Sequence, residues 1–193
     1  MDCKTEWESI HQDDLWVYNK LFLSRVLGYN CGPSGVPVSQ PGSYIIRPTF
    51  NIMGMGRGAR IEFIQKDTEH IHPSEFWCEI FSGEHLSVDY QHKNPTLTVR
   101  GTRNPEDPLY KWSKWEKVDY TIDFPEILNK LVGSYEFINC EFIGGKLIEV
   151  HFRYNSDFRF GNTVAIPVWN ENIDSTYTFV KDEDYLRTGF YIN

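Results

Sequence analysis

The sequence predicts an α+β fold built mainly from antiparallel sheets with a few helices. Helical patterns cover residues 13–27 and 123–133, and short segments rich in β-branched and aromatic side chains follow each of them. Two such segments flank Gly144-Gly145, a dipeptide typical of the turn in an antiparallel hairpin. Because no repeat or linker divides the chain, we expect one compact domain over residues 1–193.

Composition limits the function classes. Hydrophobic residues make up 40% of the 193 residues and aromatic residues 16%, which excludes a largely disordered chain. The net charge of −8 argues against sequence-independent binding of nucleic acid but suits a site that collects divalent cations. No apolar run is long enough to span a bilayer, and the polar start is not a signal peptide. Four widely spaced cysteines indicate reduced thiols, so we expect a cytoplasmic protein, or one in the host cytoplasm if the chain is viral.

The first third of the chain predicts one helix, a loop and a strand. Leu15, Tyr18, Phe22 and Val26 recur at helical spacing, and Gly28 can end the helix. Prolines and glycines exclude regular structure over residues 29–42, and the strand 43–48 follows.

The middle and last thirds predict further strands and a short helix. Residues 60–64, 76–81, 86–90 and 96–102 have strand character, and the last three of these segments are expected to share one sheet. Trp112 and Trp115 lie among lysines over residues 111–117; we favour a packed flap there over a nucleic-acid-binding module, because acidic neighbours cancel the positive charge. After the helix 123–133 and the hairpin, residues 163–169 form an apolar run and residues 176–180 have strand character.

A glycine-rich segment at residues 51–60 separates two strand-like runs. Gly54, Gly56 and Gly58 alternate there, and Arg57 and Arg60 add positive charge. Exposed backbone N–H groups in such a loop can bind an anion, although a flexible turn explains the same pattern.

The hairpin carries the densest group of functional side chains. Glu149, His151 and Arg153 alternate on its second arm and therefore share a face. A three-residue turn would place Glu141 opposite Glu149, whereas a two-residue turn would place Cys140 there. A solvated, charged sheet face is the simplest alternative.

Other chemistries have weaker support. His70 and His72 could bind zinc with Glu69 or Glu75, but no further ligand is evident. No sequence pattern indicates a nucleophilic serine or cysteine, and negative neighbours raise the pKa of the Cys140 thiol.

Taken in order, several segments resemble the nucleotide-binding core of the ATP-grasp superfamily of carboxylate–amine ligases. Residues 19–38 are similar to the opening of that core, with Lys20 at its lysine position, and residues 44–48 are similar to a strand that ends in lysine-proline, with Arg47 in place of the lysine. Residues 51–58 resemble its glycine-rich flap. Residues 76–89 resemble its hinge, with Glu79 at the glutamate position, His85 where a ribose-binding acid is expected and Glu84 one place early. Residues 141–153 resemble its metal-binding hairpin, with His151 in place of an asparagine.

The resemblance implies an ATP-grasp-like core of two small lobes, at about residues 15–80 and 81–193, that uses ATP and Mg²⁺. Glu141 and Glu149 would hold the metal, and Arg153 and His151 would be catalytic. The residues implied to contact the nucleotide are Lys20, Arg47, Gly54, Gly56, Arg57, Gly58, Glu79 and Glu84. The implied reaction is ligation of a small-molecule or peptide carboxylate to an amine through an acyl phosphate, without a membrane or nucleic-acid partner.

A second hypothesis is a non-catalytic binding or host-interaction protein on a reduced form of this scaffold. It is motivated by the changed positions and by a length that leaves no room for the amino-terminal substrate domain of the family.

Overall fold

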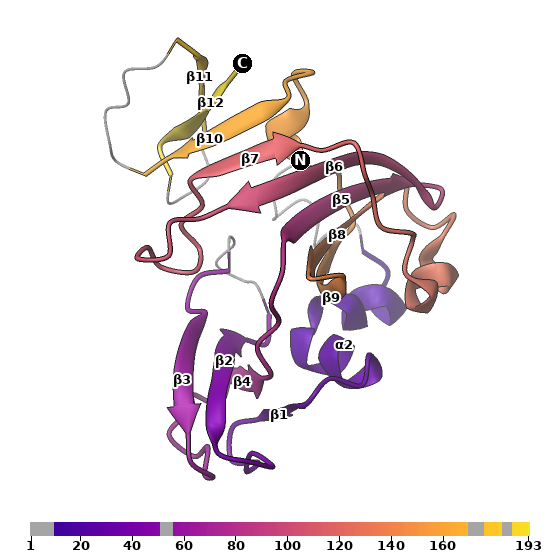
Figure 1. Cartoon of the computed structure of the whole chain (residues 1–193). Helices are drawn as coiled ribbons and strands as arrows, with labels where there is room; N and C mark the ends of the chain where they lie inside the picture. The colour runs from indigo at the N-terminus through magenta and orange to yellow at the C-terminus, as the bar shows by residue number, and fades with distance from the viewer. Residues whose placement is uncertain (1–9, 51–55, 170–175, 183–186) are drawn as a thin grey trace.

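The structure is a computed structural model that describes residues 10–50, 56–169, 176–182 and 187–193. Two antiparallel sheets form two lobes, with the smaller sheet below the larger one in Figure 1. The smaller sheet has the strand order β1-β4-β2-β3. Its strands are β1 (Cys31–Pro33), β2 (Gly42–Pro48), β3 (Arg60–Ile64) and β4 (Glu75–Cys78). Together with the few short helices, the two sheets confirm the predicted α+β class.

The larger sheet has the strand order β11-β12-β10-β7-β6-β5-β8-β9, and all of its pairings are antiparallel. Its strands are β5 (His85–Gln91), β6 (Asn94–Thr102), β7 (Lys114–Lys117), β8 (Phe137–Ile143), β9 (Lys146–His151), β10 (Val164–Val168), β11 (Thr178–Lys181) and β12 (Gly189–Ile192). Residues 137–151 therefore form the predicted hairpin, at the end of the sheet opposite β11.

The single helix predicted over residues 13–27 is wrong, because Asn19 divides it. A 3₁₀-helix, η1 (Gln12–Tyr18), ends where Asn19 adopts an extended backbone, and α2 (Lys20–Val26) begins immediately after it. The Asn19 side chain accepts a hydrogen bond from the Phe22 N–H at 2.9 Å, so it caps the N-terminus of α2. The second predicted helix is the short 3₁₀-helix η2 (Glu126–Leu131), and η3 (Ser156–Phe158) is a third.

The segment predicted as a strand over residues 76–81 belongs to the smaller sheet rather than to the sheet of β5 and β6. Its strand ends at Cys78, and Gly83 then adopts φ +122°, a backbone conformation that side chains rarely allow. The chain turns there from one sheet into the other. Residues 114–117, which lie within the predicted packed flap, form β7 because they pair with β6 and β10.

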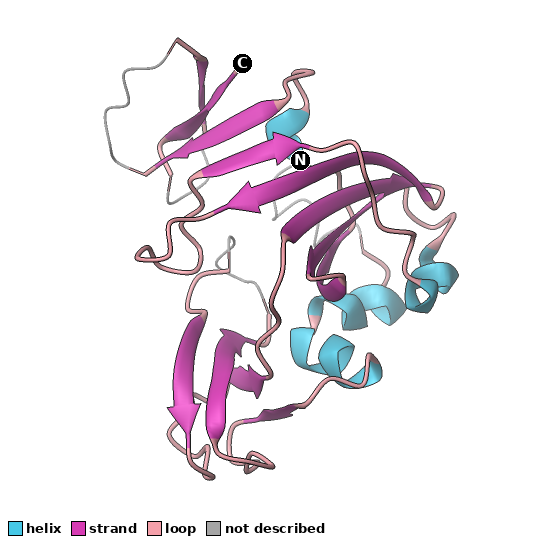
Figure 2. Ribbon diagram, in the orientation of Figure 1, coloured by secondary structure: helices cyan, strands magenta, loops and turns pink. Residues whose placement is uncertain are grey.

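Three apolar clusters hold the molecule together. The largest lies between η1, α2 and η2 and one face of β5, β8 and β9, which is why these helices gather on one side of the molecule (Figure 2). A second cluster packs on the smaller sheet, and a third joins β6, β10, β12 and η3. The alternation of the strands leaves the other face of β5, β8 and β9 for polar side chains. Among the described residues, no helix has the length and hydrophobicity needed to cross a membrane.

Candidate functional site

Glu141 on β8 lies directly opposite Glu149 on β9. The turn between these strands contains only Gly144-Gly145, with φ of +55° and +78°, and the paired residues on either side of it are Ile143 and Lys146. A two-residue turn with two positive φ values is the type that suits a twisted hairpin. Of the two turn lengths considered from the sequence, the three-residue turn is therefore wrong.

A β-bulge restores the facing of the two glutamates. The register shifts between Glu141 and Phe142, so that Ile148 is an extra residue on β9. The bulge also gives the Ile148 carbonyl a role, because Arg47 NH2 donates a hydrogen bond to it at 2.9 Å. Arg47 lies on β2, so this bond joins the smaller sheet to the hairpin.

The tip of the hairpin packs against the connection between the two sheets. The Gly144 N–H donates to the Glu84 carbonyl at 3.0 Å. A Cβ on Gly83 would lie 2.7 Å from Gly144 Cα, and a Cβ on Gly144 would collide with the Ser82 carbonyl oxygen. Glycine is required at both positions because the two backbones approach so closely.

Lys20 and Arg47 reach Glu149 from two different elements. Lys20 Nζ lies 2.8 Å from Glu149 Oε2, and Arg47 NH2 lies 4.0 Å from the same oxygen. The Lys20 N–H donates to the Thr49 carbonyl at 2.9 Å, which fixes the start of α2 beside the end of β2. The side chains of Lys20 and Glu149 are only 4% and 10% exposed, so this is a buried ion pair.

The electrostatics of this pair are dominated by burial. Burial lowers the pKa of Lys20, and the attraction of Glu149 offsets only part of this effect. Burial alone would raise the pKa of Glu149, but the charge of Lys20, a hydrogen bond with His151 and the charge of Arg47 outweigh it. The pKa of Glu149 is therefore well below its ordinary value, and this carboxylate stays ionised.

Glu141 has a different partner. His85 Nε2 lies 3.0 Å from Glu141 Oε2, whereas Glu141 Oε1 accepts no hydrogen bond from the described residues. Burial raises the pKa of Glu141, and so does the facing Glu149. The hydrogen bond from His85 and the charges of His85 and His151 lower it by more, so the pKa of Glu141 lies below its ordinary value. The Glu141 side chain is 27% exposed, which leaves this carboxylate accessible.

A second polar row lies beside the glutamates and was not predicted from the sequence. Asp89 on β5 is paired with Asn139 on β8, and Asn139 with His151 on β9. Asn139 Nδ2 donates to Asp89 Oδ1 at 2.7 Å and to Ser87 Oγ at 2.8 Å, and the Asn155 N–H donates to both Asp89 oxygens at 3.0 and 2.9 Å. Burial raises the pKa of Asp89, and these donors offset part of the rise. The alternation of Ser87 and Asp89 with apolar residues along β5 is the sequence pattern that could have predicted this polar row.

The two residues predicted to be catalytic extend from the same strand. His151 Nε2 lies 3.3 Å from Glu149 Oε1, and the His151 ring packs edge-on against Tyr18, with 6.2 Å between ring centroids. Arg153 follows the end of β9 and is half-buried, and its charge lies near enough to Asp89 to lower the pKa of that carboxyl. The structure thus brings Lys20, Arg47, Glu141, Glu149, His151 and Arg153 into one region.

Glu79 and Glu84, by contrast, are engaged elsewhere. Glu79 Oε1 accepts a hydrogen bond from the Asn30 N–H at 2.8 Å beside β1. Glu84 bonds to Arg100 NH1 at 2.9 Å and to the Tyr120 hydroxyl. Because Arg100 is paired with Leu86 while Glu141 is paired with Ser87, Arg100 lies on the opposite sheet face from Glu141.

Part of the glycine-rich segment lies outside the described residues, including Gly54. Gly56 and Gly58 both have positive φ, at +68° and +83°, and they flank Arg57 in a turn that leads into β3. Arg60 forms a two-pronged ion pair with Glu75, at 2.7 and 3.0 Å, and is therefore held within the smaller sheet.

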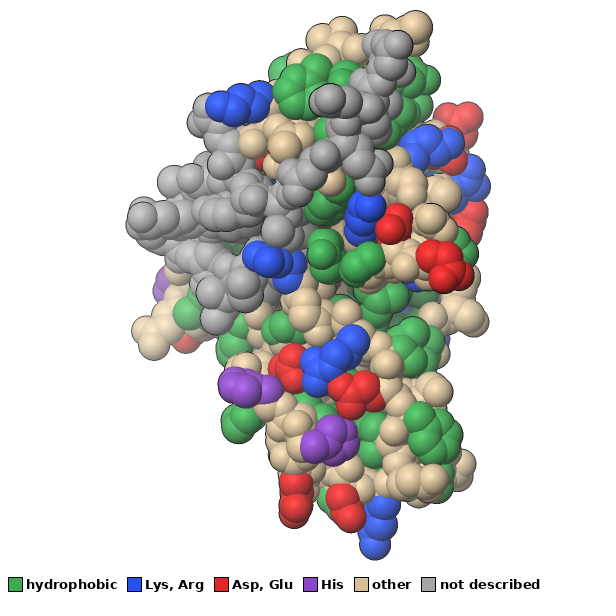
Figure 3. Space-filling model, turned by 90° about the vertical axis from the view of Figure 1, so that its left-hand side faces the viewer, with side chains coloured by type: hydrophobic (Ala, Val, Ile, Leu, Met, Phe, Trp, Pro, Cys, Tyr) green, Lys and Arg blue, Asp and Glu red, His purple; other side chains and the backbone are tan. Residues whose placement is uncertain are grey.

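The zinc site considered at His70 and His72 has no support. Both histidines lie in turns rather than on a strand; His70 Nε2 is 3.2 Å from Glu62 Oε2, and His72 bonds to Ser74. Figure 3 shows histidine, acidic and basic side chains gathered on the smaller lobe, in the lower part of the view. Across the described parts of the chain, no three His, Cys, Asp or Glu side chains are grouped so as to hold a metal by themselves.

The donor set nevertheless fits a magnesium ion bound together with phosphate groups. Mg²⁺ is usually held by one or two carboxylates, while substrate phosphates and water complete its shell. Glu141 and Glu149 supply two facing carboxylates, and Glu141 Oε1 carries no hydrogen bond from the described residues. The structure therefore offers the number and type of oxygen ligands that such an ion needs from protein.

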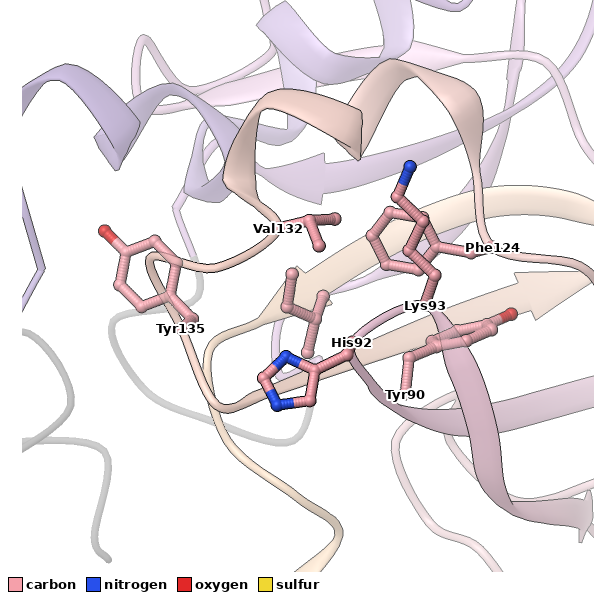
Figure 4. A pocket seen from close by; sticks show the side chains of 7 residues that line it. Tyr90, His92, Lys93, Phe124, Val132 and Tyr135 are labelled. Atoms are coloured by element: carbon pink, nitrogen blue, oxygen red, sulfur yellow. The ribbon is translucent and has the colours of Figure 1, made fainter.

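The small apolar hollow in Figure 4 lies away from these carboxylates. It is lined by Tyr90, His92, Lys93, Phe124, Val132, Tyr135 and Ile138. Tyr90 and Ile138 belong to the apolar cluster on the helix-covered face of the larger sheet, so this hollow faces away from the glutamates.

Several solved structures are similar to this fold. An ATP-grasp superfamily protein from Archaeoglobus fulgidus matches 92% of this chain with a TM-score of 0.53 and 12% sequence identity. The chain has the ATP-grasp fold. An L-amino acid ligase from Bacillus licheniformis matches 93% of this chain and 67% of its own length, with a TM-score of 0.47 and 8% identity. The ATP-grasp ligase PsnB, complexed with minimal precursor, matches 75% of this chain and 53% of its own, with a TM-score of 0.44 and 14% identity.

The likeness to ATP-grasp proteins is one of fold. No protein-family model and no curated protein matches the sequence. The chain spans 65% of the length of the Archaeoglobus fulgidus protein.

Proposed function

We propose that the protein binds ATP with Mg²⁺ and joins a carboxylate to an amine through an acyl phosphate. The observation that carries this proposal is the ionised, facing pair Glu141 and Glu149, with Lys20 and Arg47 converging on Glu149 from α2 and β2. Two carboxylates and two cations from four separate elements meet where the two sheets approach.

The charges of this region suit a nucleoside triphosphate. Glu141 and Glu149 would hold Mg²⁺, which supplies neutralisation of charge on the phosphate oxygens. Lys20 and Arg47 add positive charge beside the carboxylates, and Arg153 adds a planar guanidinium that can pair with phosphate in two-pronged fashion. Little covalent chemistry is required of the protein, since positioning and charge stabilisation drive phosphoryl transfer.

Apolar side chains for a nucleobase lie on the same face of the smaller sheet as Arg47. Ile45 alternates with Arg47 along β2, and its pairing partner on β3 is Ile61, while Phe63 is paired with Ser43. Ile61 and Phe63 are 53% and 64% exposed, so this face offers apolar area to a ligand. Because Arg47 reaches the hairpin, this face is turned toward the carboxylates.

The glycine turn and the remaining polar groups complete the proposal. Gly56, Arg57 and Gly58 lead into β3 next to this apolar face, where backbone N–H groups can contact phosphate. Glu79 follows β4 at the connection between the sheets, where its backbone could contact the base. His151 would orient Glu149, to which it is hydrogen bonded, rather than bind the metal, because nitrogen is a poor ligand for Mg²⁺.

A specific observation favours a non-catalytic binding protein as the second candidate. Both carboxylates already have partners within the chain, since Lys20 and His151 contact Glu149 and His85 contacts Glu141. Charged side chains that are already paired with one another can stabilise the fold without catalysing a reaction.

Calorimetric titration with ATP and Mg²⁺ separates these proposals. We expect the wild type to bind and Glu141→Gln to bind at least about tenfold more weakly, as for loss of a metal ligand. Glu69→Gln, on an exposed loop of the smaller lobe, is the matched control and should bind as the wild type does. Absence of binding at millimolar ATP would refute nucleotide use. Binding without release of ADP or phosphate, across amino acids, peptides and amines, would favour the second candidate.

A further inference from the structure

His85 is placed to control the orientation of Glu141. It is the first residue of β5, and Nε2 of its ring is 3.0 Å from Glu141 Oε2. The His85 side chain is only 13% exposed. Because it is the one hydrogen-bonding partner of the Glu141 carboxylate among the described residues, the direction of that carboxylate depends on where the imidazole lies.

Two tryptophans restrict the imidazole. The rings of Trp112 and Trp115 stand edge-on to His85, with centroid distances of 4.5 and 5.5 Å and interplanar angles of 80° and 89°. The two indoles also contact each other at 4.8 Å between centroids. Edge-to-face contacts at these distances are favourable and directional, so the ring of His85 has one preferred orientation.

A glycine makes room for this arrangement. Gly101 on β6 is paired with His85, and a Cβ at this position would lie 2.8–2.9 Å from Trp112 and Trp115. Any other residue would push the indoles away from the imidazole. The absence of a side chain at position 101 therefore permits the packing of His85.

The segment that carries the tryptophans is itself anchored. Trp169, which follows β10, donates from Nε1 to the Trp112 carbonyl at 2.7 Å. The Ser113 N–H donates to the Thr102 carbonyl at 2.9 Å. The backbone that carries Trp112 is thus anchored to residues at the ends of β6 and β10.

We propose that His85 is a positioning residue for the cation-binding carboxylate Glu141, and that Trp112 and Trp115 are the groups that fix His85 in this role. The proposal rests on the proposed function, in which Glu141 and Glu149 hold a divalent cation. A residue that hydrogen bonds to a metal-binding carboxylate orients it, and removal of such a partner typically weakens metal binding 10- to 100-fold.

Binding of Mn²⁺, a paramagnetic substitute for Mg²⁺, tests the proposal without an activity assay. Free Mn²⁺ is measured by electron paramagnetic resonance in the presence of a non-hydrolysable ATP analogue. We expect His85→Ala to weaken Mn²⁺ binding about 10- to 100-fold. His85→Gln restores an amide donor near the position of Nε2 and should recover most of the affinity. His92→Asn changes an exposed histidine in the turn after β5 and should leave binding unchanged.

A second variant moves the tryptophans without altering His85 or Glu141. Gly101→Ala displaces the indoles, so we expect weaker Mn²⁺ binding together with a changed tryptophan emission spectrum. Thermal unfolding of each variant separates loss of the fold from loss of the site.

The outcomes distinguish failure of the proposed role of His85 from failure of the proposed function. Mn²⁺ binding by the wild type that His85→Ala leaves unchanged overturns the role of His85 while the proposed function stands. Equal losses in His85→Ala and His85→Gln, accompanied by equal losses of thermal stability, overturn it in favour of a packing role. Absence of Mn²⁺ binding by the folded wild type overturns both proposals.

Discussion

Replacement of Glu149 by glutamine removes the counter-ion of a buried lysine, and we expect it to destabilise the fold strongly. Lys20 Nζ and Glu149 Oε2 are 2.8 Å apart, and an effective dielectric constant of about 20 gives an attraction of about 6 kcal/mol between unit charges at that distance. Desolvation of each buried ion costs several kcal/mol, so the intact pair contributes little net stability. Without Glu149, however, Lys20 remains buried and uncompensated, which costs about 3–5 kcal/mol.

Urea unfolding followed by tryptophan fluorescence measures this cost. Because ordinary domains are stable by only about 5–15 kcal/mol, Glu149→Gln should shift the unfolding midpoint far toward lower urea. Glu84→Gln is the matched control, since it breaks an ion pair with Arg100 at the protein surface, where solvent screens the attraction, and it should leave the midpoint nearly unchanged.

The double variant Lys20→Met, Glu149→Leu tests the reasoning more directly. Replacement of both ions by apolar residues of similar size should recover at least about half of the loss caused by Glu149→Gln. A double variant as unstable as Glu149→Gln, or a Glu149→Gln variant as stable as the wild type, would contradict the uncompensated Lys20 charge as the cause of the loss.

The same carboxylate predicts a pH dependence. The pKa of Glu149 lies well below its ordinary value of 4.5 in the folded state, so the folded chain binds fewer protons than the unfolded chain between the two pKa values. The stability that Glu149 contributes is therefore present above about pH 4.5 and is lost as the pH falls through the folded pKa. The difference in unfolding free energy between the wild type and Glu149→Gln should shrink on acidification; a constant difference would contradict this account.

Two further predictions concern close contacts. Gly144→Ala should cost about 1–3 kcal/mol more stability than Gly145→Ala in urea unfolding, because only the Cβ at 144 meets the Ser82 carbonyl; equal losses would show that the hairpin tip does not pack there. Cys31 and Cys78 are directly paired on β1 and β4, and paired Cα atoms in antiparallel strands lie within disulfide range, so diamide treatment should link them. Peptide mapping detects this link, and its absence while both thiols stay reduced would refute the expected geometry.

Alternation along the strands left the facing of Glu141 and Glu149 open, because that facing depends on the length of the turn. The resemblance favoured the facing, but the structure achieves it by a bulge and not by a three-residue turn. The bulge at Ile148 was not predictable, because nothing in the local pattern distinguishes an extra strand residue from a longer turn. The carbonyl that it presents to Arg47 was missed for the same reason.

The hydrogen-bonding partners of the glutamates could not be predicted from the local sequence either. His85 was considered only as a substitute for a ribose-binding acid, and its contact with Glu141 depends on the pairing of β5 with β8. Asp89 was overlooked although Ser87 and Asp89 alternate within an apolar strand, a pattern that marks a polar face. The break at Asn19 was missed because a capping side chain within a helical pattern is a weak signal until tertiary packing selects it.

The contact between Gly83 and Gly144 has a mechanical consequence for the two lobes. The connection between the sheets is seated on the hairpin tip with no side chain between them, so a side chain at either glycine would push the two sheets apart at this point. Lys20 lies on a helix that contacts both β1 and β9, and its N–H donates to the Thr49 carbonyl, while Arg47 donates to the Ile148 carbonyl. A shift between the sheets would therefore disturb the contacts of both cations with Glu149 together, rather than those of Arg47 alone.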